Sequence, residues 1–382
     1  MANFLKNLLN KISLPSPRRS ESVVGVDIGA SSIKVVQLKK EKGKAALETY
    51  GELSLGPYAS GPAGSPTNLS SEVLANALKD VFRESQITSS DVAVSIPAAS
   101  SLIFILELPG SQSEKDLREI VPIEARRYIP VPISEVSLDW WSFPKREEEY
   151  AEPEVSQGEA LTESRPRLDQ NKTEVLVAAI HNDILNKYRE ISEKAGLGGS
   201  LLEIEIFSNI RSALGHDLST IMLIDFGASS TKLSIVENGI MRKFHIIARG
   251  SALISGNLSK ALDIPFARAE SLKKEFGLLG IGTNKNVADV SALVIEYIFS
   301  EANEVLLNYE RKTGKTANKI IFSGGGSLLK GFLDKARDNF KTEVLLSDPF
   351  GKTEAPEFLQ KVLQSVGLPF GVAVGLALKK IQ

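Results

Sequence analysis

The chain has no cysteine among its 382 residues. This excludes disulfides, thiolate metal sites and cysteine nucleophiles, and it agrees with a reducing compartment. Histidine is almost as scarce, since His181, His216 and His245 occur singly along the chain. A histidine-based metal cluster is therefore not expected.

Long apolar runs are also missing. The longest, Leu102–Leu106 and Val366–Leu378, fall short of the roughly 20 residues that a membrane-spanning helix needs. The N-terminus does not show the basic, apolar and small-residue regions of a signal peptide. The net charge of -2 and the pI near 6.1 give no basic excess that would indicate nucleic-acid binding. We therefore expect a cytoplasmic protein that does not bind nucleic acid.

The remaining composition, 42% hydrophobic and 24% charged, is that of a globular protein. A chain of this length exceeds one ordinary core, which predicts two domains or a two-lobed body. Short apolar strands alternate with helical patterns and indicate an α/β protein. The expected strands are 23–28, 34–38, 92–96, 102–108, 136–143, 175–180 and 201–206, and the expected helices are 72–84, 115–127, 183–195 and 207–214.

Three segments stand apart from this pattern. In Met1–Ile12 the apolar residues share one helical face, and prolines separate this segment from the body. It is expected to pack on the body, to dock in a groove of the protein or to bind a membrane weakly. The Gly-, Pro- and Ser-rich stretch Gly56–Ser70 is predicted to be flexible, and the acidic, polar stretch 145–172 to be a disordered loop. The apolar residues of the first segment are Phe4, Leu5, Leu8, Leu9 and Ile12.

An internal repeat is the most informative feature of the sequence. The octet DIGASSIK at 27–34 recurs as DFGASSTK at 225–232, 198 residues later (225 minus 27), with six of eight positions identical. Each copy follows one apolar strand and precedes another. Two such copies in the same context indicate that the chain consists of two related halves.

The repeated octet has the chemistry of a phosphate-binding hairpin. Glycine permits close approach of a phosphate, and serine hydroxyls with successive amides form an anion-binding nest. The aspartate at each strand end suits a magnesium ion held through water beside the phosphates. A single copy is more typical of an ordinary turn, but the duplication favours two hairpins that clamp one nucleotide. The predicted phosphate contacts are Gly29, Ala30, Ser31, Ser32, Gly227, Ala228, Ser229 and Ser230, with Asp27 and Asp225 at the metal.

A third glycine-rich element follows an apolar strand at 319–323. Gly324, Gly325, Gly326 and Ser327 are expected to let a base or ribose lie against the backbone, although a plain strand-to-helix turn explains the pattern equally well. Gly314-Lys315-Thr316 resembles the end of a P-loop, but that motif needs glycine at position 309, where this chain has Tyr309. We therefore do not interpret it as a nucleotide site.

These three elements, in this order, resemble the superfamily of actin, sugar kinases and heat-shock chaperone ATPases. The resemblance covers about 23–378 and implies a two-lobed, ribonuclease H-like fold with ATP and magnesium between the lobes. It implies that Lys34 contacts phosphate, and that Glu205, at a strand-to-helix junction, lies near the metal and the attacking water. Glu270 and Lys273 are the implied ribose and adenine contacts, although an exposed i, i+3 ion pair is the alternative. Residues 367–378 resemble the second connecting helix.

The block between Pro97 and Asp183 resembles the extra subdomain shared by the FtsA and PilM families. DIGASSIKVVQL, EARRYIPVPISEVSLDWW and VAAIHNDILNKYREISEKAGL are most similar to PilM. This resemblance implies an ATP-binding protein on the inner face of the cytoplasmic membrane, which holds the N-terminal cytoplasmic tail of PilN and links it to the pilus motor ATPases. FtsA proteins normally end in an amphipathic anchor, whereas here the sequence ends just after the second connecting helix.

The sequence therefore predicts an actin-like fold with an FtsA/PilM-type insertion. Its expected function is a nucleotide-gated scaffold, with an FtsA-like cell-division protein and a small-molecule kinase as alternatives. A kinase needs a general base, and Asn182-Asp183, the one tempting pair, is better explained as a helix N-cap. With Glu205 and Asp225 as the catalytic candidates, ATP hydrolysis is expected to be slow at most.

The expected domains are 1–21 (N-terminal segment), 22–97 with 182–218 (lobe I), 98–181 (insertion), 219–252 with 318–382 (lobe II base) and 253–317 (lobe II helical subdomain).

Overall fold

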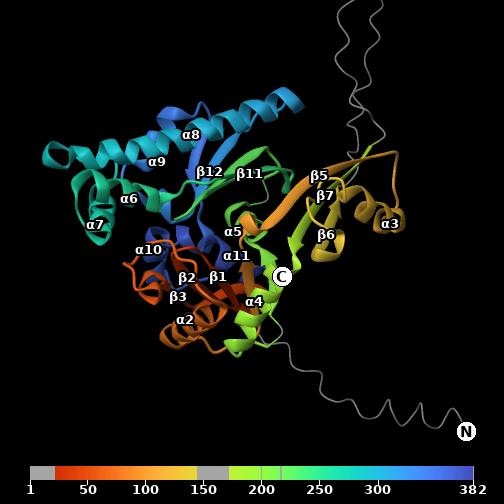
Figure 1. Ribbon diagram of the computed structural model, residues 1–382, viewed down its shortest axis with the longest axis horizontal. Helices are drawn as coiled ribbons and strands as arrows, with labels where there is room; N and C mark the ends of the chain where they lie inside the picture. The colour runs from red at the N-terminus through yellow and green to blue at the C-terminus, as the bar shows by residue number, and fades with distance from the viewer. Residues whose placement is uncertain (1–21, 144–171, 199, 216, 382) are drawn as a thin grey trace, which may run out of the picture.

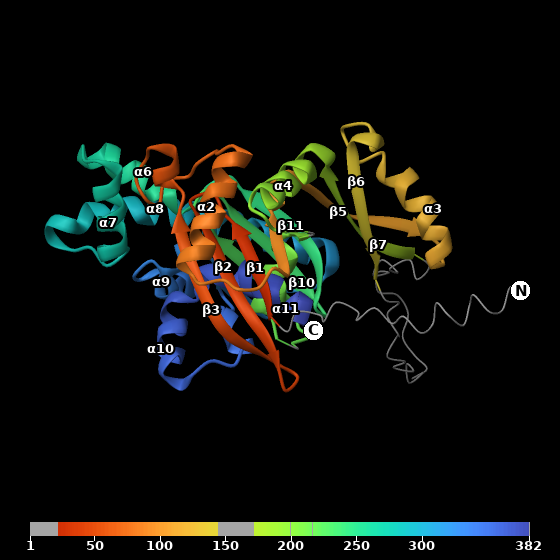
Figure 2. The same ribbon diagram turned by 90° about the horizontal axis from the view of Figure 1, so that it is seen from below.

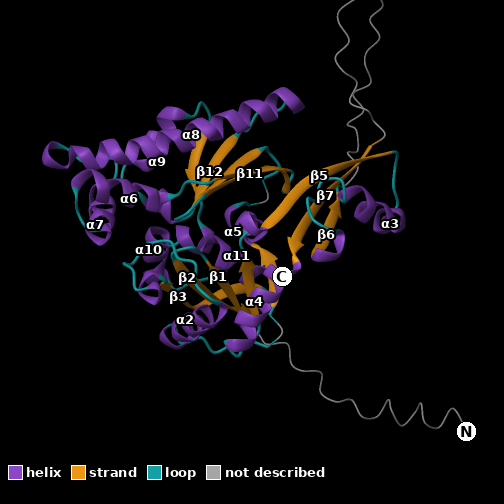
Figure 3. Ribbon diagram, in the orientation of Figure 1, coloured by secondary structure: helices purple, strands orange, loops and turns teal. Residues whose placement is uncertain are grey.

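The computed structural model describes residues 22–143 and 172–381, except for 199 and 216. The predicted N-terminal segment and nearly all of the predicted loop 145–172 lie outside the described residues. Figure 1 shows two lobes with a third, smaller sheet at one end, and Figure 3 shows that each of the three parts contains both strands and helices.

Lobe I is built on a five-stranded sheet. Its strand order is β3-β2-β1-β4-β8, with an antiparallel β1–β2–β3 meander and parallel neighbours β4 and β8. The predicted hairpin is confirmed, whereas β3 was absent from the sequence prediction. Helices α2 and α4 cover one face of this sheet through a shared apolar cluster. The elements are β1 (Ser22–Ile28), β2 (Ser32–Glu41), β3 (Lys44–Ser54), α2 (Ser71–Glu84), β4 (Val92–Ile96), α4 (Asn182–Lys194) and β8 (Leu201–Ile204).

Lobe II repeats the same sheet topology in the order β11-β10-β9-β12-β13. The strand pairings match those of lobe I one for one in direction, which confirms the duplication predicted from the repeated octet. The long helix α8 covers the sheet together with α6 and α9 (Figure 1). The elements are β9 (Ile221–Phe226), β10 (Thr231–Glu237), β11 (Ile240–Ile247), α6 (Ser251–Leu262), α7 (Phe266–Phe276), α8 (Lys285–Thr313), β12 (Lys319–Ser323), α9 (Phe332–Asn339), β13 (Glu343–Leu346) and α10 (Glu357–Val366).

Two helices, α5 (Glu205–Ala213) and α11 (Gly371–Ile381), lie between the lobes and pack against each other. Helix α11 follows the lobe II sheet in sequence, yet it packs on β1, β2 and β4 of lobe I. Glycine makes this close approach possible, because a Cβ atom at Gly375 would lie 1.8 Å from the Ser208 carbonyl oxygen of α5. A Cβ atom at Gly25 on β1 would likewise lie 1.9 Å from the Ala373 oxygen. The lobes are therefore joined through backbone-to-backbone contacts that tolerate no side chain.

The inserted subdomain is a three-stranded antiparallel sheet in the order β5-β7-β6. Helix α3 covers one face of this sheet, and the other face packs against β11 and the start of α5. On that side, Arg242 of β11 forms a 2.7 Å ion pair with Glu174 of β7. Figures 1 and 2 place this subdomain at the end of the molecule opposite α7. The elements are β5 (Ser101–Pro109), α3 (Glu114–Ala125), β6 (Val136–Ser142) and β7 (Lys172–His181).

The stretch 56–70, predicted to be flexible, is instead bonded to lobe I and lies close to lobe II. It begins with a 3-10 turn, Gly56–Ala59, and the Thr67 amide donates to the Ala30 carbonyl oxygen of the first hairpin at 2.8 Å. At Gly64 the loop approaches Glu270 of lobe II so closely that a Cβ atom would lie 3.1 Å from the carboxyl carbon. The loop thus crosses from one lobe to the other.

Within the part of the chain that the structure describes, no single helix is long and apolar enough to cross a membrane. The helical segments 357–366 and 368–381 are long and apolar enough only when taken together, and the chain bends by 81° between them.

Candidate functional site

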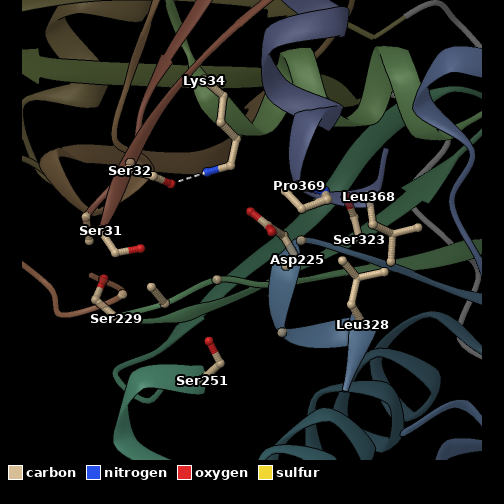
Figure 4. Close-up of a pocket in the computed structure, with 18 of the residues that line it drawn as sticks. Ser31, Ser32, Lys34, Asp225, Ser229, Ser251, Ser323, Leu328, Leu368 and Pro369 are labelled. Atoms are coloured by element: carbon tan, nitrogen blue, oxygen red, sulfur yellow. Dashed lines mark hydrogen bonds between the residues drawn. The ribbon is translucent and has the colours of Figure 1, made fainter. Parts of the chain in front are cut away.

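The two copies of the octet face one cleft between the lobes, with a volume of about 660 Å³. Each copy forms the same turn, because the Gly29 amide donates to the Ser32 carbonyl oxygen at 3.0 Å and the Gly227 amide to that of Ser230 at 3.1 Å. Figure 4 shows Ser31 and Ser229 at the tips of the two turns, on the same side of the pocket. All eight predicted phosphate contacts line the cleft. The repeat therefore brings two equivalent anion-binding turns to one site.

The floor of the cleft carries three carboxylates and two lysines. Asp27 and Asp225 are the second-to-last residues of strands β1 and β9, and Glu205 begins α5; all three are buried yet line the cleft. Glu205 Oε1 accepts a 2.8 Å bond from the Ala98 amide, and its Oε2 lies 2.9 Å from Lys232 Nζ. Lys232 Nζ also lies 3.3 Å from Asp225 Oδ2. Sequence reasoning missed Lys232, although it ends the second octet at the position equivalent to Lys34.

Lys34 has different partners from Lys232. Its Nζ donates to Ser32 Oγ at 2.7 Å, drawn as a dashed line in Figure 4, and lies 3.5 Å from Glu52. Asp27, in turn, accepts a 3.0 Å bond from Ser95 Oγ. The two repeats thus hold the same residue types in different electrostatic arrangements.

Burial dominates the electrostatics of these groups. Burial raises the pKa of Asp27 to about 6; Lys34 opposes this shift, and Glu205 adds to it. For Lys232, burial acts to lower the pKa, but Asp225 and Glu205 outweigh it and hold the pKa well above the usual range. The cleft therefore keeps one carboxylic acid that is easily protonated beside a lysine that stays charged.

Helix α7 and the triple glycine also line the cleft. Glu270 lies 2.7 Å from Lys273 Nζ and 2.5 Å from Ser255 Oγ, and both members of the pair are buried rather than exposed. Burial acts to raise the pKa of Glu270, but Lys273 outweighs it and lowers the pKa overall. Burial lowers the pKa of Lys273. The alternative of an exposed helical ion pair is therefore wrong for these two residues.

The triple glycine lines the cleft, and close packing against neighbouring residues also requires glycine at two of its three positions. At Gly324, with φ +81°, a Cβ atom would lie 2.4 Å from Asp225 Oδ1, and at Gly326 it would lie 2.5 Å from the Phe226 ring. Gly325 faces Pro369 at an ordinary 3.5 Å. Ser327 is the predicted residue that the structure does not bring to the cleft, because its buried hydroxyl donates to the Ser323 carbonyl oxygen at 2.9 Å.

Several lining residues carried no sequence signal. They come from turns and helix ends far apart in the chain, so only the fold collects them. Figure 4 shows Ser251 near the second hairpin, and Leu368, Pro369 and Leu328 on the far side of Asp225. The further lining residues are Glu52 and Ser54 of β3, Ala63 and Gly64 of the crossing loop, Asn209 of α5, Ile254, Lys274, Ser323, Leu329, Gly371 and Val372.

Whether the site suits magnesium depends on its oxygen ligands. Among the described residues there is no group of three or more acidic, histidine or cysteine side chains that could hold a metal by itself. Magnesium bound with a nucleotide, however, takes most of its ligands from water and phosphate and needs only one or two carboxylates. Asp27 and Asp225 beside the two turns fit that requirement, so magnesium remains a prediction that the donor set permits.

The residues considered for a kinase lie elsewhere. Asp183 is in the first turn of α4 and does not line the cleft, and its amide donates to the His181 side chain at 3.3 Å. The N-cap of this helix is therefore His181, which corrects the predicted cap at 182–183. Asn182 instead ties α4 to the inserted subdomain, through a 2.9 Å bond from Ser137 Oγ.

Two lobes of one topology, with matching turns over a shared cleft, define an actin-like fold. Solved structures agree: the "PilM-PilN type IV pilus biogenesis complex" aligns with a TM-score of 0.75 and 22% identity over 96% of this chain and 100% of that one. The ethanolamine utilization protein EutJ from Carboxydothermus hydrogenoformans aligns with a TM-score of 0.51 and 16% identity over 99% and 96%. The family model described as type IV pilus assembly protein PilM matches residues 25–381, and the chain belongs to that family.

Curated relatives are more distant cell-division proteins. FtsA of Neisseria meningitidis serogroup B is 26% identical over 242 residues, which is 57% of this chain and 56% of that protein. FtsA of Bacillus subtilis is 23% identical over 261 residues, or 62% and 56%. The chain thus spans about half the length of the curated relatives it matches, whereas the PilM model covers nearly all of it.

Proposed function

We propose that this chain binds Mg-ATP between its two hairpins and serves as a scaffold of the type IV pilus inner-membrane assembly complex, where it holds the N-terminal cytoplasmic tail of PilN. The observation that carries the nucleotide part is the pair of identical turns facing one cleft of about 660 Å³. The partner is inferred from family membership and from the complex to which the chain is similar.

Different residues of the cleft are proposed to bind different parts of the nucleotide. The turns at 29–32 and 227–230 receive the phosphates, and the Glu270–Lys273 pair with Gly324–Gly326 receives the ribose and base. Magnesium would neutralise part of the triphosphate charge beside Asp27 and Asp225. Glu205 is a weak general base, because one oxygen is bonded to the Ala98 amide and the other is paired with Lys232. We therefore propose slow ATP hydrolysis at most.

The adenosine end can be tested separately from the phosphates. Lys273→Met removes the buried ammonium group 2.7 Å from Glu270, so we expect about tenfold weaker ATP binding, the loss of one charge-assisted contact. Binding of inorganic triphosphate, which has no adenosine, should stay unchanged. Calorimetric titration with both ligands measures the difference; an equal loss for ATP and triphosphate would place Lys273 at the phosphates instead.

Nucleotide and partner binding are proposed to be coupled through α5. This helix begins with Glu205 in the cleft, and two residues later Phe207 packs against Trp141 of the inserted subdomain, with ring centroids 5.3 Å apart. Trp141 is 44% exposed, so this contact joins the cleft to the surface of the subdomain. If ATP shifts α5, it changes the surface on which a peptide would lie, and the effect is reciprocal.

Tryptophan fluorescence can report this coupling, because the chain has two tryptophans and both are on β6. In a Trp140→Phe variant, ATP should change the emission of Trp141 with a midpoint equal to the calorimetric Kd. Phe207→Leu should remove most of this change without weakening ATP binding. An emission unaffected by saturating ATP would contradict coupling along this path.

The scaffold function is tested with a synthetic PilN tail. We expect this peptide to bind in solution with an affinity that ATP alters, and we expect no rapid phosphorylation of sugars. Failure of the peptide to bind with or without ATP, together with rapid sugar phosphorylation, would favour the kinase.

A cytoplasmic position at the inner membrane, next to the motor ATPases, is part of the same proposal. Attachment is proposed to run through PilN, with a second contribution from Phe4–Ile12. Liposome flotation of the full chain and of a variant lacking 1–20 separates these routes. Equal flotation of both would show that the N-terminal segment does not contribute to membrane attachment.

A further inference from the structure

Lys232 lies where a divalent cation would otherwise balance the carboxylates of the cleft. Its Nζ is 2.9 Å from Glu205 Oε2 and 3.3 Å from Asp225 Oδ2, and its side chain is 13% exposed. Both carboxylates are 10% exposed, so little water screens the three charges. The second repeat thus contains a fixed positive charge between two of the three predicted metal ligands.

A lysine in this place changes what a metal ion can do. A divalent ion drawn to Glu205 and Asp225 would lie next to the ammonium group, and the two cations would repel each other in a poorly screened site. Lys34, the equivalent residue of the first repeat, instead contacts Ser32 and Glu52. This asymmetry between the repeats does not follow from their nearly identical sequences.

The ammonium group also has the chemistry to bind phosphate directly. It carries three N–H donors, and the bonds to Glu205 and Asp225 use two of them. A third donor can serve a phosphate oxygen while both carboxylates hold the side chain in place. Lys232 lines the cleft together with the two hairpin turns, so it is within the same site as the proposed phosphates.

We propose that Lys232 acts as a built-in cation at the terminal-phosphate end of the cleft and takes over part of the charge neutralisation that a divalent metal provides. This inference rests on the proposed nucleotide site and adds to it that ATP binds measurably without divalent metal. Lys232 also keeps Glu205 and Asp225 paired in the absence of nucleotide, which agrees with slow hydrolysis.

The test is calorimetric titration of the full chain with ATP, once with magnesium and once with EDTA. For the unmodified chain we expect removal of magnesium to weaken binding by about tenfold or less, since a charge-assisted contact is worth a factor of about 10 to 100. For Lys232→Met we expect near-normal affinity with magnesium and a loss of about hundredfold or more with EDTA. Lys243→Met, an exposed residue of the neighbouring strand β11, removes the same charge and should behave as the unmodified chain.

Lys232→Met leaves two buried carboxylates without their partner, so its melting temperature is measured alongside. Lys232→Gln, which keeps a hydrogen-bond donor but no charge, replaces it if the methionine variant does not fold. Binding of ATP to the unmodified chain only with magnesium would overturn the inference and leave the nucleotide site standing. The inference would also be overturned if a folded Lys232 variant lost no more ATP affinity in EDTA than the unmodified chain does. No ATP binding in either buffer would instead refute the proposed function.

Discussion

Replacing Asp27 by asparagine is expected to raise the melting temperature of the nucleotide-free protein at pH 7.5 while it weakens ATP binding. Asp27 is 7% exposed, and burial raises its pKa from 3.8 to about 6. A shift of this size corresponds to about 3 kcal/mol of destabilisation of the charged form. Asparagine loses the attraction to Lys34, so the free energy of unfolding is expected to rise by about 1–2 kcal/mol in net terms, which raises the melting temperature by about 1–3 °C.

The same gain should depend on pH with a defined sign. Because the folded-state pKa lies above the unfolded value, the wild-type protein takes up a proton at Asp27 as the pH falls through about 6, and its relative stability rises. The advantage of Asp27→Asn should therefore shrink between pH 7 and pH 4. Differential scanning calorimetry across this range measures it, with Asp334→Asn, an 83% exposed carboxylate, as the charge-matched control. An asparagine variant less stable than the wild type at pH 7.5 would contradict the electrostatics described for this site.

Gly375→Ala is expected to be among the most damaging single-methyl additions in the chain. The new Cβ atom would lie 1.8 Å from the Ser208 carbonyl oxygen, and a backbone atom cannot rotate out of the way. Either α5 and α11 must separate or one of them must distort, at a cost of about 2–4 kcal/mol. Because these two helices join the lobes, ATP affinity should fall as well.

Gly256→Ala provides the matched control. Gly256 is also inside a helix, α6, but a Cβ atom there meets nothing within 4 Å. Alanine in a helix interior is favoured over glycine by up to about 1 kcal/mol, so this variant should be neutral or more stable. Chemical denaturation measures the free energy of unfolding of both variants. Similar values for the two would show that α5 and α11 are not packed as described.

Local sequence chemistry predicted the parts of the fold that depend on neighbours in the chain. The hairpin turns are an example, because the bonds from Gly29 to Ser32 and from Gly227 to Ser230 span three residues. The repeat then indicated that both halves share a topology, and the sheets confirm it. Strand β3 was missed because its residues are half-exposed, so no continuous apolar run marks it.

The features that sequence reasoning missed depend on contacts between distant residues. Lys232 is part of the repeat in lobe II, but its partner Glu205 belongs to α5, the helix that follows the last strand of the lobe I sheet. The loop 56–70 has the composition of a flexible linker, yet it donates a hydrogen bond to Ala30 of lobe I and lies close to Glu270 of lobe II. Ser327 was expected at the cleft because it follows the triple glycine, but the 3-10 turn at 325–328 directs its hydroxyl to Ser323.

The most direct test of the whole account is a calorimetric titration of Mg-ATP into the full chain, Asp27→Ala and Asp225→Ala. One aspartate belongs to each hairpin, and both are buried beneath the same cleft. We expect one ATP per chain for the unmodified protein and a loss of at least about hundredfold in affinity for each variant while its circular dichroism stays native. Wild-type affinity in both folded variants would show that the two turns do not close on one nucleotide.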